Sequence, residues 1–271
     1  MITFPNAKIN LGLYVERKRE DGYHDLSTVF YPIPLTDAVE VVEAKETALF
    51  TYGNPVDCPP EKNLVMKAYR LMEEEFKLPT VAIHLYKHIP DGAGLGGGSS
   101  DATSVAKILN SMFALGLSEE EIAVRVKRLG ADCPFFAYNR PMAARGIGDL
   151  LEPVDVDLRG YTMIVVKPDV SVPTAAAYAG GTPRVPETDV EKLVAKPVGQ
   201  WKGLLVNDFE ESIFPKHPEL SAIKQSLYDA GAVYASMSGS GSAIFGLFED
   251  DNLSDIFAAK CAQPLLYKMK L

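Results

Sequence analysis

The chain has 271 residues, of which 47% are apolar, and its 27 Lys and Arg against 36 Asp and Glu give a formal net charge of −9. This composition is that of a globular protein with a real core, which excludes disorder as its main state. The acidic balance argues against general binding to nucleic acid or to anionic membranes.

The length predicts one large or two modest domains. No apolar run approaches the roughly 18 residues that cross a bilayer, and the first ten residues, MITFPNAKIN, show no secretory signal. Three distant cysteines without a CxxC pair are typical of a reducing compartment. We therefore expect a cytoplasmic protein with no membrane or nucleic-acid partner. The three are Cys58, Cys133 and Cys261.

The first half of the chain alternates predicted strands and helices. Ile9, Leu11, Leu13 and Val15 alternate with less apolar residues, which predicts a strand, and a turn ending in Asp-Gly follows. Further strands are expected over 29–33, 39–42 and 80–87, with a helix over 63–76. A helix is expected from Ser99 or Ser100 until Gly116, and a capping box at 118–121 predicts another that ends near 129.

A glycine-bearing loop is expected over 143–153, and we place a domain boundary there, dividing the chain into 1–153 and 154–271. Beyond it the pattern predicts strands over 163–166, 234–237 and 243–248. Helices are expected over 174–178, 188–196, 218–230 and 254–261. This mixture lacks a regular βαβ rhythm and favours an α+β fold.

The most informative segment is glycine-rich, with five glycines in the seven positions 92–98. Such backbone can turn its amides inward to hold an anion, and the following helix directs its own N–H groups to the same place. Phosphate is the expected ligand, and the serine hydroxyls are candidates for capping, phosphate or magnesium. The segment consists of Pro90, Asp91, Gly92, Ala93, Gly94, Leu95, Gly96, Gly97, Gly98, Ser99 and Ser100.

Several known phosphate loops fail to match this segment. Gly98 stands where a Walker A loop needs lysine. Gly92, Gly94 and Gly97 form a literal GxGxxG, but a second helix follows instead of the strand with an acidic end that a dinucleotide fold requires. Protein-kinase motifs are missing from the sequence. A flexible linker is disfavoured because the segment lies between a strand and a strongly amphipathic helix.

Two isolated charged residues are candidates for chemistry. Lys8 and Asn10 share a strand face, although a lone strand lysine is far more often a solvated surface residue. Asp132 stands between a helix end and Pro134, where the alternative is that it only caps the next turn. Taken alone, each of these residues favours the structural alternative. The occurrence of Lys8, Asn10 and Asp132 in one chain favours a functional role for them.

Three motifs together resemble those of the GHMP kinases (galactose, homoserine, mevalonate and phosphomevalonate kinases and relatives). They are PNAKINLGLYV with GYHDLSTVF, PDGAGLGGGSSDA, and SMSGSGSA, in that order. The additional segments GADCPFF and NDFE resemble the branch that phosphorylates a cytidine diphosphate sugar alcohol in isoprenoid precursor synthesis. The resemblance implies a two-lobed α+β GHMP-kinase fold, with a ribosomal-protein-S5-domain-2-like N-terminal lobe and a ferredoxin-like C-terminal lobe. It also implies ATP and Mg²⁺ as cofactors.

The resemblance implies roles for single residues. Asp132 would be the base that takes the proton of the acceptor hydroxyl group, assisted by Lys8, and Asn10 would position substrate. His24 would meet the edge of the cytosine while Tyr23 and Tyr178 stack on its faces. Asp208, in the NDFE segment, receives no role, and no magnesium ligand can be named.

Two rival readings stay open. One is another small-molecule kinase of the superfamily, of the homoserine or mevalonate type, which would not need the two tyrosines. The other is a nucleotide-binding regulator on the same fold without catalysis. The presence of Lys8, Asp132 and the glycine-rich segment together argues against the second.

Overall fold

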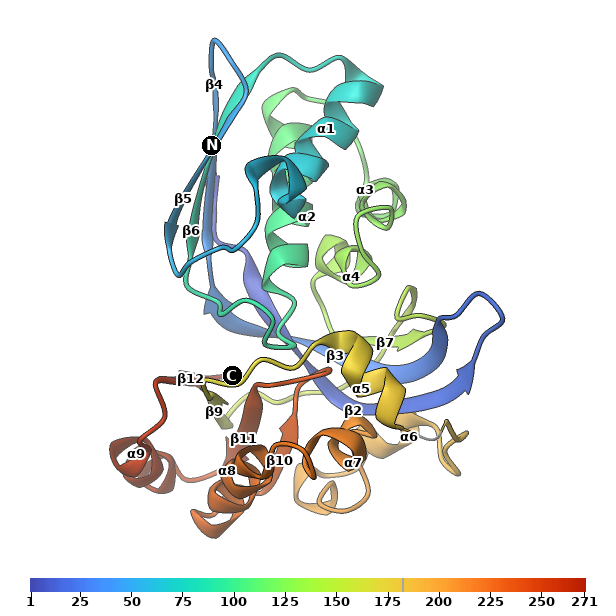
Figure 1. Ribbon diagram of the computed structural model, residues 1–271, viewed down its shortest axis with the longest axis vertical. Coiled ribbons are helices and arrows are strands. Elements are labelled where there is room, and N and C mark those ends of the chain that lie inside the picture. The colour runs from blue at the N-terminus through green and yellow to red at the C-terminus, as the bar shows by residue number, and fades with distance from the viewer. Residues whose placement is uncertain (182) are drawn as a thin grey trace. The chain divides into compact units, whose positions relative to one another are not determined.

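The computed structural model describes residues 1–181 and 183–271. They fold into two compact units, each built from separate stretches of the chain (Figure 1). The first unit contains residues 1–7, 35–91 and 96–140, and the second contains residues 8–34, 92–95 and 141–271. Residues 8–34 and 141–153 thus cluster with the C-terminal part of the chain, so neither unit coincides with the stretch 1–153.

A four-stranded sheet in the order β1-β4-β6-β5 forms the frame of the first unit. β4 is antiparallel to β1 and β6, and β5 is parallel to β6. The strands are β1 (Ile2–Thr3), β4 (Ala38–Glu43), β5 (Ala48–Gly53) and β6 (Val81–Lys87). The helices are the 3₁₀ turn η1 (Pro60–Lys62), α1 (Leu64–Phe76), α2 (Gly97–Met112), α3 (Glu119–Val126) and α4 (Cys133–Tyr138).

The predicted caps and periodicities explain these elements. Asn63 caps α1 by accepting a hydrogen bond from the amide of Val65, and the capping box between Ser118 and Glu121 is present at α3. The buried faces of β4 and β6 form one apolar core with the helices, so the helices cover one face of the sheet (Figure 1).

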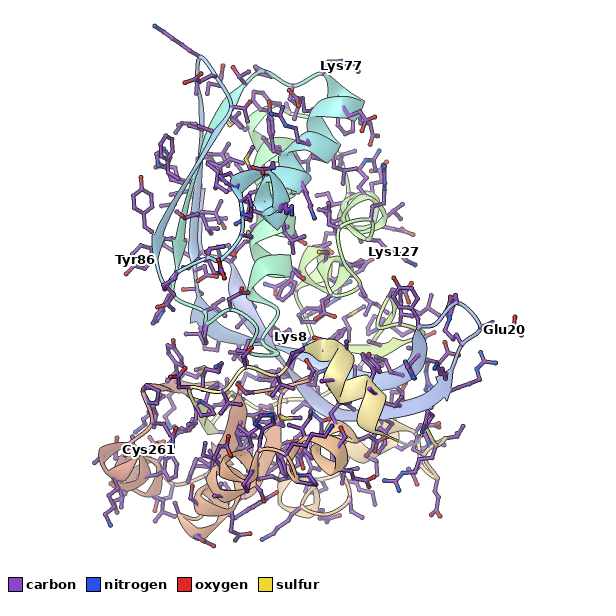
Figure 2. All side chains as sticks on the ribbon, in the orientation of Figure 1. Lys8, Glu20, Lys77, Tyr86, Lys127 and Cys261 are labelled. Atoms are coloured by element: carbon purple, nitrogen blue, oxygen red, sulfur yellow. The ribbon has the colours of Figure 1, made fainter. Side chains whose placement is uncertain are left out.

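The opposite face of this sheet carries aromatic side chains that reach solvent. Phe50, Tyr52 and Tyr86 are each about half exposed, and Tyr86 projects outward from the sheet in Figure 2. His84 stacks on Phe50, with ring centres 4.9 Å apart. The pairing of Phe50 with His84 and of Tyr52 with Tyr86 across β5 and β6 brings these rings together.

Two four-stranded sheets form the frame of the second unit, in the orders β2-β3-β7-β8 and β10-β11-β9-β12. The first contains β2 (Asn6–Lys18), β3 (His24–Thr36), β7 (Met142–Arg145) and β8 (Leu150–Pro153). The second contains β9 (Thr162–Lys167), β10 (Tyr234–Met237), β11 (Ile244–Phe248) and β12 (Leu265–Lys270). The helices are α5 (Thr174–Gly180), α6 (Val190–Val194), the 3₁₀ turn η2 (Val198–Gln200), α7 (Phe209–Ile213), α8 (Pro218–Asp229) and α9 (Asp251–Lys260).

The apolar core of the second unit joins segments that are far apart in sequence. Leu13 and Val15 of β2 pack in the same cluster as Phe209 of α7, Leu227 of α8 and Phe257 of α9. The antiparallel pairing of β9 with both β11 and β12 places β9 inside its sheet. Every residue of β9 except Lys167 is buried, as its continuous apolar sequence predicted.

Most predicted elements are confirmed, with three corrections. The stretch 143–153 is not a loop, because β7 and β8 pair as a hairpin whose turn contains Gly146 and Gly148 at positive φ. The helix expected from Ser99 or Ser100 begins at Gly97 and ends at Met112. Short elements without a strong pattern were missed, namely β1, β5, β12, α4 and α7.

Among the described residues, none of the helices combines the length and apolar character that a bilayer-spanning segment needs.

Candidate functional site

Lys8 lies inside the second unit, on β2, with only 3% of its surface exposed. Its ammonium group donates a 2.7 Å hydrogen bond to Asn10 Oδ1 and lies 4.8 Å from the centre of the Phe30 ring. Asn10 Nδ2 donates to Thr28 Oγ1 at 3.0 Å. Lysine is almost never fully buried without such partners. The solvated-surface alternative for Lys8 is therefore wrong. The predicted placement of Lys8 and Asn10 on one strand face is confirmed, and the structure adds the hydrogen bond between them.

Residues 92–95, the first part of the glycine-rich segment, also belong to the second unit. Gly94 O accepts a hydrogen bond from Ser238 Oγ at 2.9 Å, and Leu95 O accepts one from the Lys8 amide at 2.9 Å. Gly94 has a φ of +76°, and a Cβ atom there would lie 2.0 Å from Ser238 O. Only glycine satisfies both the backbone conformation and this close approach.

We expect Gly94→Ala to lower the free energy of unfolding by about 1–3 kcal/mol more than Gly92→Ala does. Both residues have positive φ, so both variants suffer the same kind of backbone strain, but a Cβ at Gly92 would meet nothing within 4 Å. The difference between them isolates the contact with the Ser238 carbonyl group. Urea unfolding of both variants measures it, and equal losses would show that the contact is not made.

Residues 96–100, the second part of the segment, open α2 in the first unit. Gly96 is the N-cap residue, at a φ of +71°, and no side chain caps the first amides of this 16-residue helix. Those amides and the helix dipole favour an anion. A Cβ atom on Gly97 would lie 2.9 Å from Ile89 Cγ2, so the helix start packs directly on the segment before the glycines.

Asp132 is the N-cap residue of α4, but its side chain makes no capping hydrogen bond to that helix. The alternative in which this carboxylate only caps the next turn is therefore not what the structure shows, although Pro134 does stand in the first turn, as predicted. The neighbouring Cys133 is fully buried, and burial raises the pKa of its thiol to about 11. Cys133 is thus a neutral thiol near pH 7 and not a nucleophile.

Lys87, Asp37 and Asp101 form a buried ion cluster in the first unit. The sequence analysis missed this cluster, which supports both ends of the glycine-rich segment. Lys87 Nζ bonds Asp37 Oδ2 and lies 2.7 Å from Asp101 Oδ2. Asp37 Oδ1 accepts the amides of His88 and Ile89 at 2.5 and 2.7 Å. Lys87 ends β6 before the glycines and Asp101 lies in the first turns of α2 after them, so the cluster ties the two together.

The cluster holds two carboxyl groups against one ammonium group, and this affects Asp101. Asp101 is 1% exposed, and its Oδ1 has no hydrogen-bond partner among the described residues. Burial, only partly offset by the charge of Lys87, raises the pKa of Asp101 to about 8. A neutral carboxyl group at this position suits the single positive charge better than a second carboxylate.

The Asp101 carboxyl group should therefore make the free energy of unfolding smaller as the pH rises. Asp101 keeps its proton in the folded chain up to about pH 8, whereas the unfolded chain loses it near the ordinary value of 3.8. The contribution is full below that ordinary value and is lost as the pH rises through about 8. Melting temperatures of the native chain and of Asp101→Asn across this window test the prediction. The variant should show the smaller fall, and parallel curves would contradict it.

The aromatic residues predicted for substrate lie in the second unit. The rings of His24 and Tyr178 are stacked, with centres 4.8 Å apart and planes at 21°. Tyr23 is 61% exposed. The structure thus brings His24 to the Tyr178 ring, where the resemblance implied a base between Tyr23 and Tyr178. Tyr23 lies directly before β3, which begins at His24.

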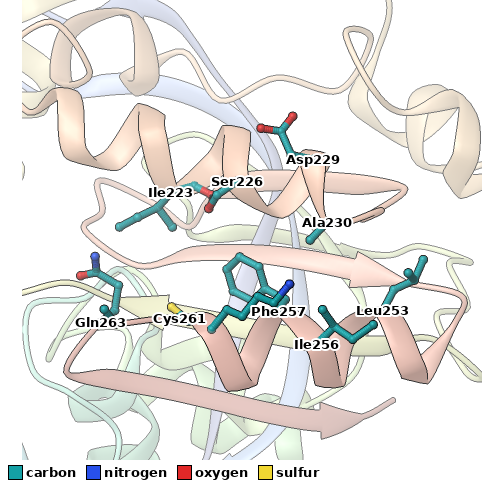
Figure 3. A pocket seen from close by; sticks show the side chains of 11 residues that line it. Ile223, Ser226, Asp229, Ala230, Leu253, Ile256, Phe257, Cys261 and Gln263 are labelled. Carbon is teal, nitrogen blue, oxygen red and sulfur yellow. The ribbon is translucent and has the colours of Figure 1, made fainter.

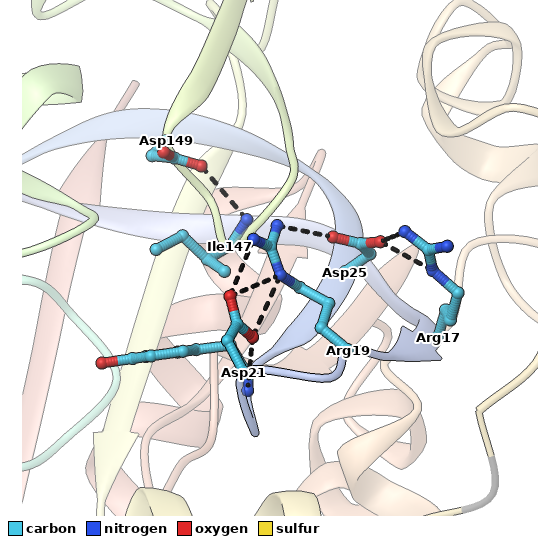
Figure 4. A network of polar contacts seen from close by, with 7 residues as sticks. Arg17, Arg19, Asp21, Asp25, Ile147 and Asp149 are labelled. Atoms are coloured by element: carbon cyan, nitrogen blue, oxygen red, sulfur yellow. Dashed lines mark hydrogen bonds and ion pairs between the residues drawn. The ribbon is translucent and has the colours of Figure 1, made fainter.

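An ion-pair network holds the β2–β3 hairpin beside Tyr23 (Figure 4). Arg17 pairs with Asp25 at 2.6 Å, and Arg19 pairs with Asp21 at 2.8 Å and with Asp25 at 3.2 Å. Asp21 Oδ1 also accepts the amide of Tyr23 at 3.1 Å. Exposed pairs of this kind contribute only about 0–1 kcal/mol each, so their effect is to order the hairpin rather than to stabilise the unit.

A pocket of about 560 Å³ lies between α8 and α9 in the second unit (Figure 3). Its walls are apolar side chains such as Ile223, Ile256 and Phe257, with Lys260 and Asp229 among the polar ones. None of the residues predicted for the site lines it. It lacks the convergent polar groups that position a reacting substrate.

The described residues contain no group of three or more His, Cys, Asp or Glu side chains that could hold a metal ion. His84 and His88, four positions apart, form no such group among the described residues. Mg²⁺ commonly binds through one or two carboxylates together with substrate phosphates and keeps several waters. A magnesium ion that arrives with a nucleotide would not need such a group.

Comparison with known proteins gives two family matches. The family described as "GHMP kinases N terminal domain" matches residues 63–140, and the one described as "GHMP kinases C terminal" matches residues 190–264. One match falls on each side of the predicted boundary at 153.

Individual relatives match over almost the whole chain. It is 52% identical to a 4-diphosphocytidyl-2-C-methyl-D-erythritol kinase of Bacteroides thetaiotaomicron, over 93% of each chain. It is 45% identical to a protein of that name from Cytophaga hutchinsonii, over 98% of this chain and 100% of the other. A crystal structure of 4-(cytidine 5'-diphospho)-2C-methyl-D-erythritol kinase is 33% identical with a TM-score of 0.84, covering 99% of this chain and 98% of that one.

Proposed function

Because the chain belongs to the 4-diphosphocytidyl-2-C-methyl-D-erythritol kinases of the GHMP kinase family, we propose that it phosphorylates the 2-hydroxyl group of 4-diphosphocytidyl-2-C-methyl-D-erythritol with ATP. The product would be a precursor in the non-mevalonate route to isoprenoids. The observation that carries the proposal is the aromatic pair of His24 and Tyr178, in the same unit as the buried Lys8. A kinase for homoserine or mevalonate would not need Tyr23 and Tyr178.

Asp132 accepts the proton of the 2-hydroxyl group as its oxygen attacks the γ-phosphorus. This role is supported by a carboxylate that its own helix does not use for capping. Lys8 donates to the reacting oxygen atoms and balances the charge on the transferred phosphoryl group, while Asn10 Oδ1 orients its ammonium group. Phosphoryl transfer depends mainly on positioning and on charge stabilisation, so one base and one cation suffice.

The glycine-rich segment from Pro90 to Ser100 holds the phosphates of ATP. Support comes from its positive-φ glycines and from the first amides of α2, which no side chain caps. Mg²⁺ would enter with the nucleotide and would neutralise phosphate charge. The three cysteines are unpaired, which suits work in the cytoplasm.

The cytidine end of the acceptor binds at Tyr23, His24 and Tyr178. Tyr178 offers a ring face on which a base can replace the His24 ring, and the exposed Tyr23 can close on the other face of the base. His24 then reaches the edge of the cytosine. Stacking on aromatic rings accepts any base, so the hydrogen bonds of His24 would select cytosine.

Tyr178→Ala should raise KM for the cytidine substrate by about 5- to 150-fold, the equivalent of one lost stacking contact. KM for ATP should stay near its native value, because the phosphate segment keeps all of its contacts. Steady-state kinetics with each substrate varied in turn measures the two constants. Tyr86→Ala, which removes an exposed ring of the first unit, is the control. Equal rises in both constants would count against a stacking role.

The proposal is tested by ADP release with Mg–ATP and four acceptors: 4-diphosphocytidyl-2-C-methyl-D-erythritol, homoserine, mevalonate and galactose. Turnover with the cytidine compound alone is the expected result. Turnover with a different acceptor would keep the kinase and reject the cytidine site. No turnover with any acceptor, together with measurable ATP binding, would favour a nucleotide-binding regulator.

A further inference from the structure

The segment Asn207–Glu210 (the NDFE segment) lies in the second unit and leads into α7. The proposed mechanism gives it no role. Its first three residues are nevertheless almost fully buried, with exposed fractions of 3% for Asn207, 8% for Asp208 and 3% for Phe209. Two of these three buried residues, Asn207 and Asp208, are polar. Their hydrogen-bonding groups therefore depend on partners inside the protein.

Two residues of the segment hold the glycine-rich turn 236–243. Asn207 Nδ2 donates to the carbonyl groups of Met237 and Gly239, both at 2.8 Å. Glu210 Oε1 accepts the amide of Met237 at 2.8 Å and the hydroxyl group of Ser236 at 3.2 Å. Both amide hydrogens of Asn207 are thus used, and the turn is fixed through its carbonyl groups and its amide.

The turn 236–243 also supports residues 92–95 of the glycine-rich segment and the strand that carries Lys8. Ser238 Oγ donates to Gly94 O at 2.9 Å and accepts the amide of Asn10 at 3.4 Å. The amide of Ala243 donates to Ala93 O at 3.1 Å. Displacement of the turn would therefore move residues 92–95, because Gly94 packs directly against the Ser238 carbonyl group of the turn.

The other two residues of the segment contact different parts of the unit. Asp208 Oδ2 accepts the amide of Val15 at 2.9 Å, which anchors the segment to β2. The ring of Phe209 lies edge-on to Tyr178, with centres 4.8 Å apart at 81°. An edge-to-face pair of this kind fixes the direction in which the Tyr178 ring faces.

We propose that the NDFE segment is a positioning element that sets the two substrate sites of this kinase separately, Asn207 through the turn 236–243 for ATP and Phe209 through Tyr178 for the cytidine end of the acceptor. The inference rests on the proposed function. Asp208 is the anchor from which both act, since it fixes the segment to the strand that carries Lys8.

Two variants should divide the kinetic constants in opposite ways. Asn207→Ser removes the double donor and should raise KM for ATP by about 5- to 150-fold, with KM for the acceptor unchanged. Phe209→Leu keeps an apolar side chain but loses the edge-on ring, and should raise KM for the acceptor by about 2- to 12-fold, with KM for ATP unchanged. Glu211→Gln, next in the same helix and exposed, is the matched control.

Hydrogen–deuterium exchange supplies a readout that does not depend on turnover. Asn207→Ser should speed exchange in residues 92–95 and 236–243, and Phe209→Leu should speed it in α5, which carries Tyr178. A purely structural role predicts instead that both variants speed exchange throughout the unit and raise both KM values together, and that result would overturn the inference. If the two variants exchange as described but the native chain turns over no acceptor, the proposed function is rejected and the positioning element is retained.

Discussion

Replacing Asp132 by asparagine is expected to lower kcat by about 10²–10⁴-fold, because an amide cannot accept the proton that leaves the acceptor hydroxyl group. The substitution keeps the size of the side chain, and α4 loses no capping hydrogen bond. Binding of ATP should therefore persist. Single-turnover kinetics measures the chemical step, and calorimetric titration with Mg–ATP measures the binding.

The matched control is Asp57→Asn, which removes an exposed carboxylate from the same unit. It should turn over at the native rate, which separates the loss of the base from the loss of one negative charge. A native kcat in Asp132→Asn would assign the base to another group. A folded variant that no longer bound ATP would place Asp132 in nucleotide binding instead.

Replacing Lys87 by methionine should lower the free energy of unfolding by about 3–5 kcal/mol, because it leaves two buried carboxyl groups without their cation. Asp37 and Lys87 are nearly inaccessible to solvent, so water cannot take over this role. The damage should extend to the phosphate segment, since the same lysine ties β6 to the start of α2. Urea unfolding followed by circular dichroism measures the loss.

A double substitution sharpens this test. Asp101→Asn removes one of the two carboxyl groups. Above about pH 8, where Asp101 has lost its proton, Lys87→Met should therefore cost less in that background than in the native chain, a difference that a double-mutant cycle reports directly. Lys67→Met, at an exposed position on α1, should change stability by no more than about 0.5 kcal/mol. Additive losses at Lys87 and Asp101 would contradict the buried cluster.

The glycine-rich motifs were predictable from the sequence because their physical constraints leave few alternatives. At Gly94 a positive φ and a carbonyl group 2.0 Å from the missing Cβ atom both demand glycine. The long amphipathic helices α1, α2 and α8 and the buried strands β2 and β9 were predictable for a similar reason, since burial on one face imposes a period.

The buried cluster around Lys87 is indicated only weakly by the sequence. Lys87 continues the alternation of Val81, Ile83 and Leu85, which places it on the covered face of β6, and a lysine at such a position signals a buried partner. The sequence cannot say which carboxylates those partners are. Asp37 is 50 positions from Lys87 and Asp101 is 14, and only the folded chain brings them together.

The elements that escaped prediction are short or lie at the edges of sheets. β5 is mostly exposed, so the sequence ALFTYG carries no alternation that burial would enforce. α7 has five residues, too few for a helical period to show. The role of the NDFE segment was beyond reach for another reason, because the contacts that carry it, to Val15, Tyr178 and Met237, are with distant parts of the chain.

The anchoring of Asp208 on Val15 has a consequence for how the ribosome delivers this protein. The two residues are separated by 193 positions, so β2 leaves the exit tunnel long before Asp208 has been synthesised. At about 5–20 residues per second, this wait is roughly 10–40 s. During that time β2 exposes Leu13 and Val15, whose packing partners have not yet been synthesised. We therefore expect the nascent chain to bind chaperones until its last third has left the ribosome.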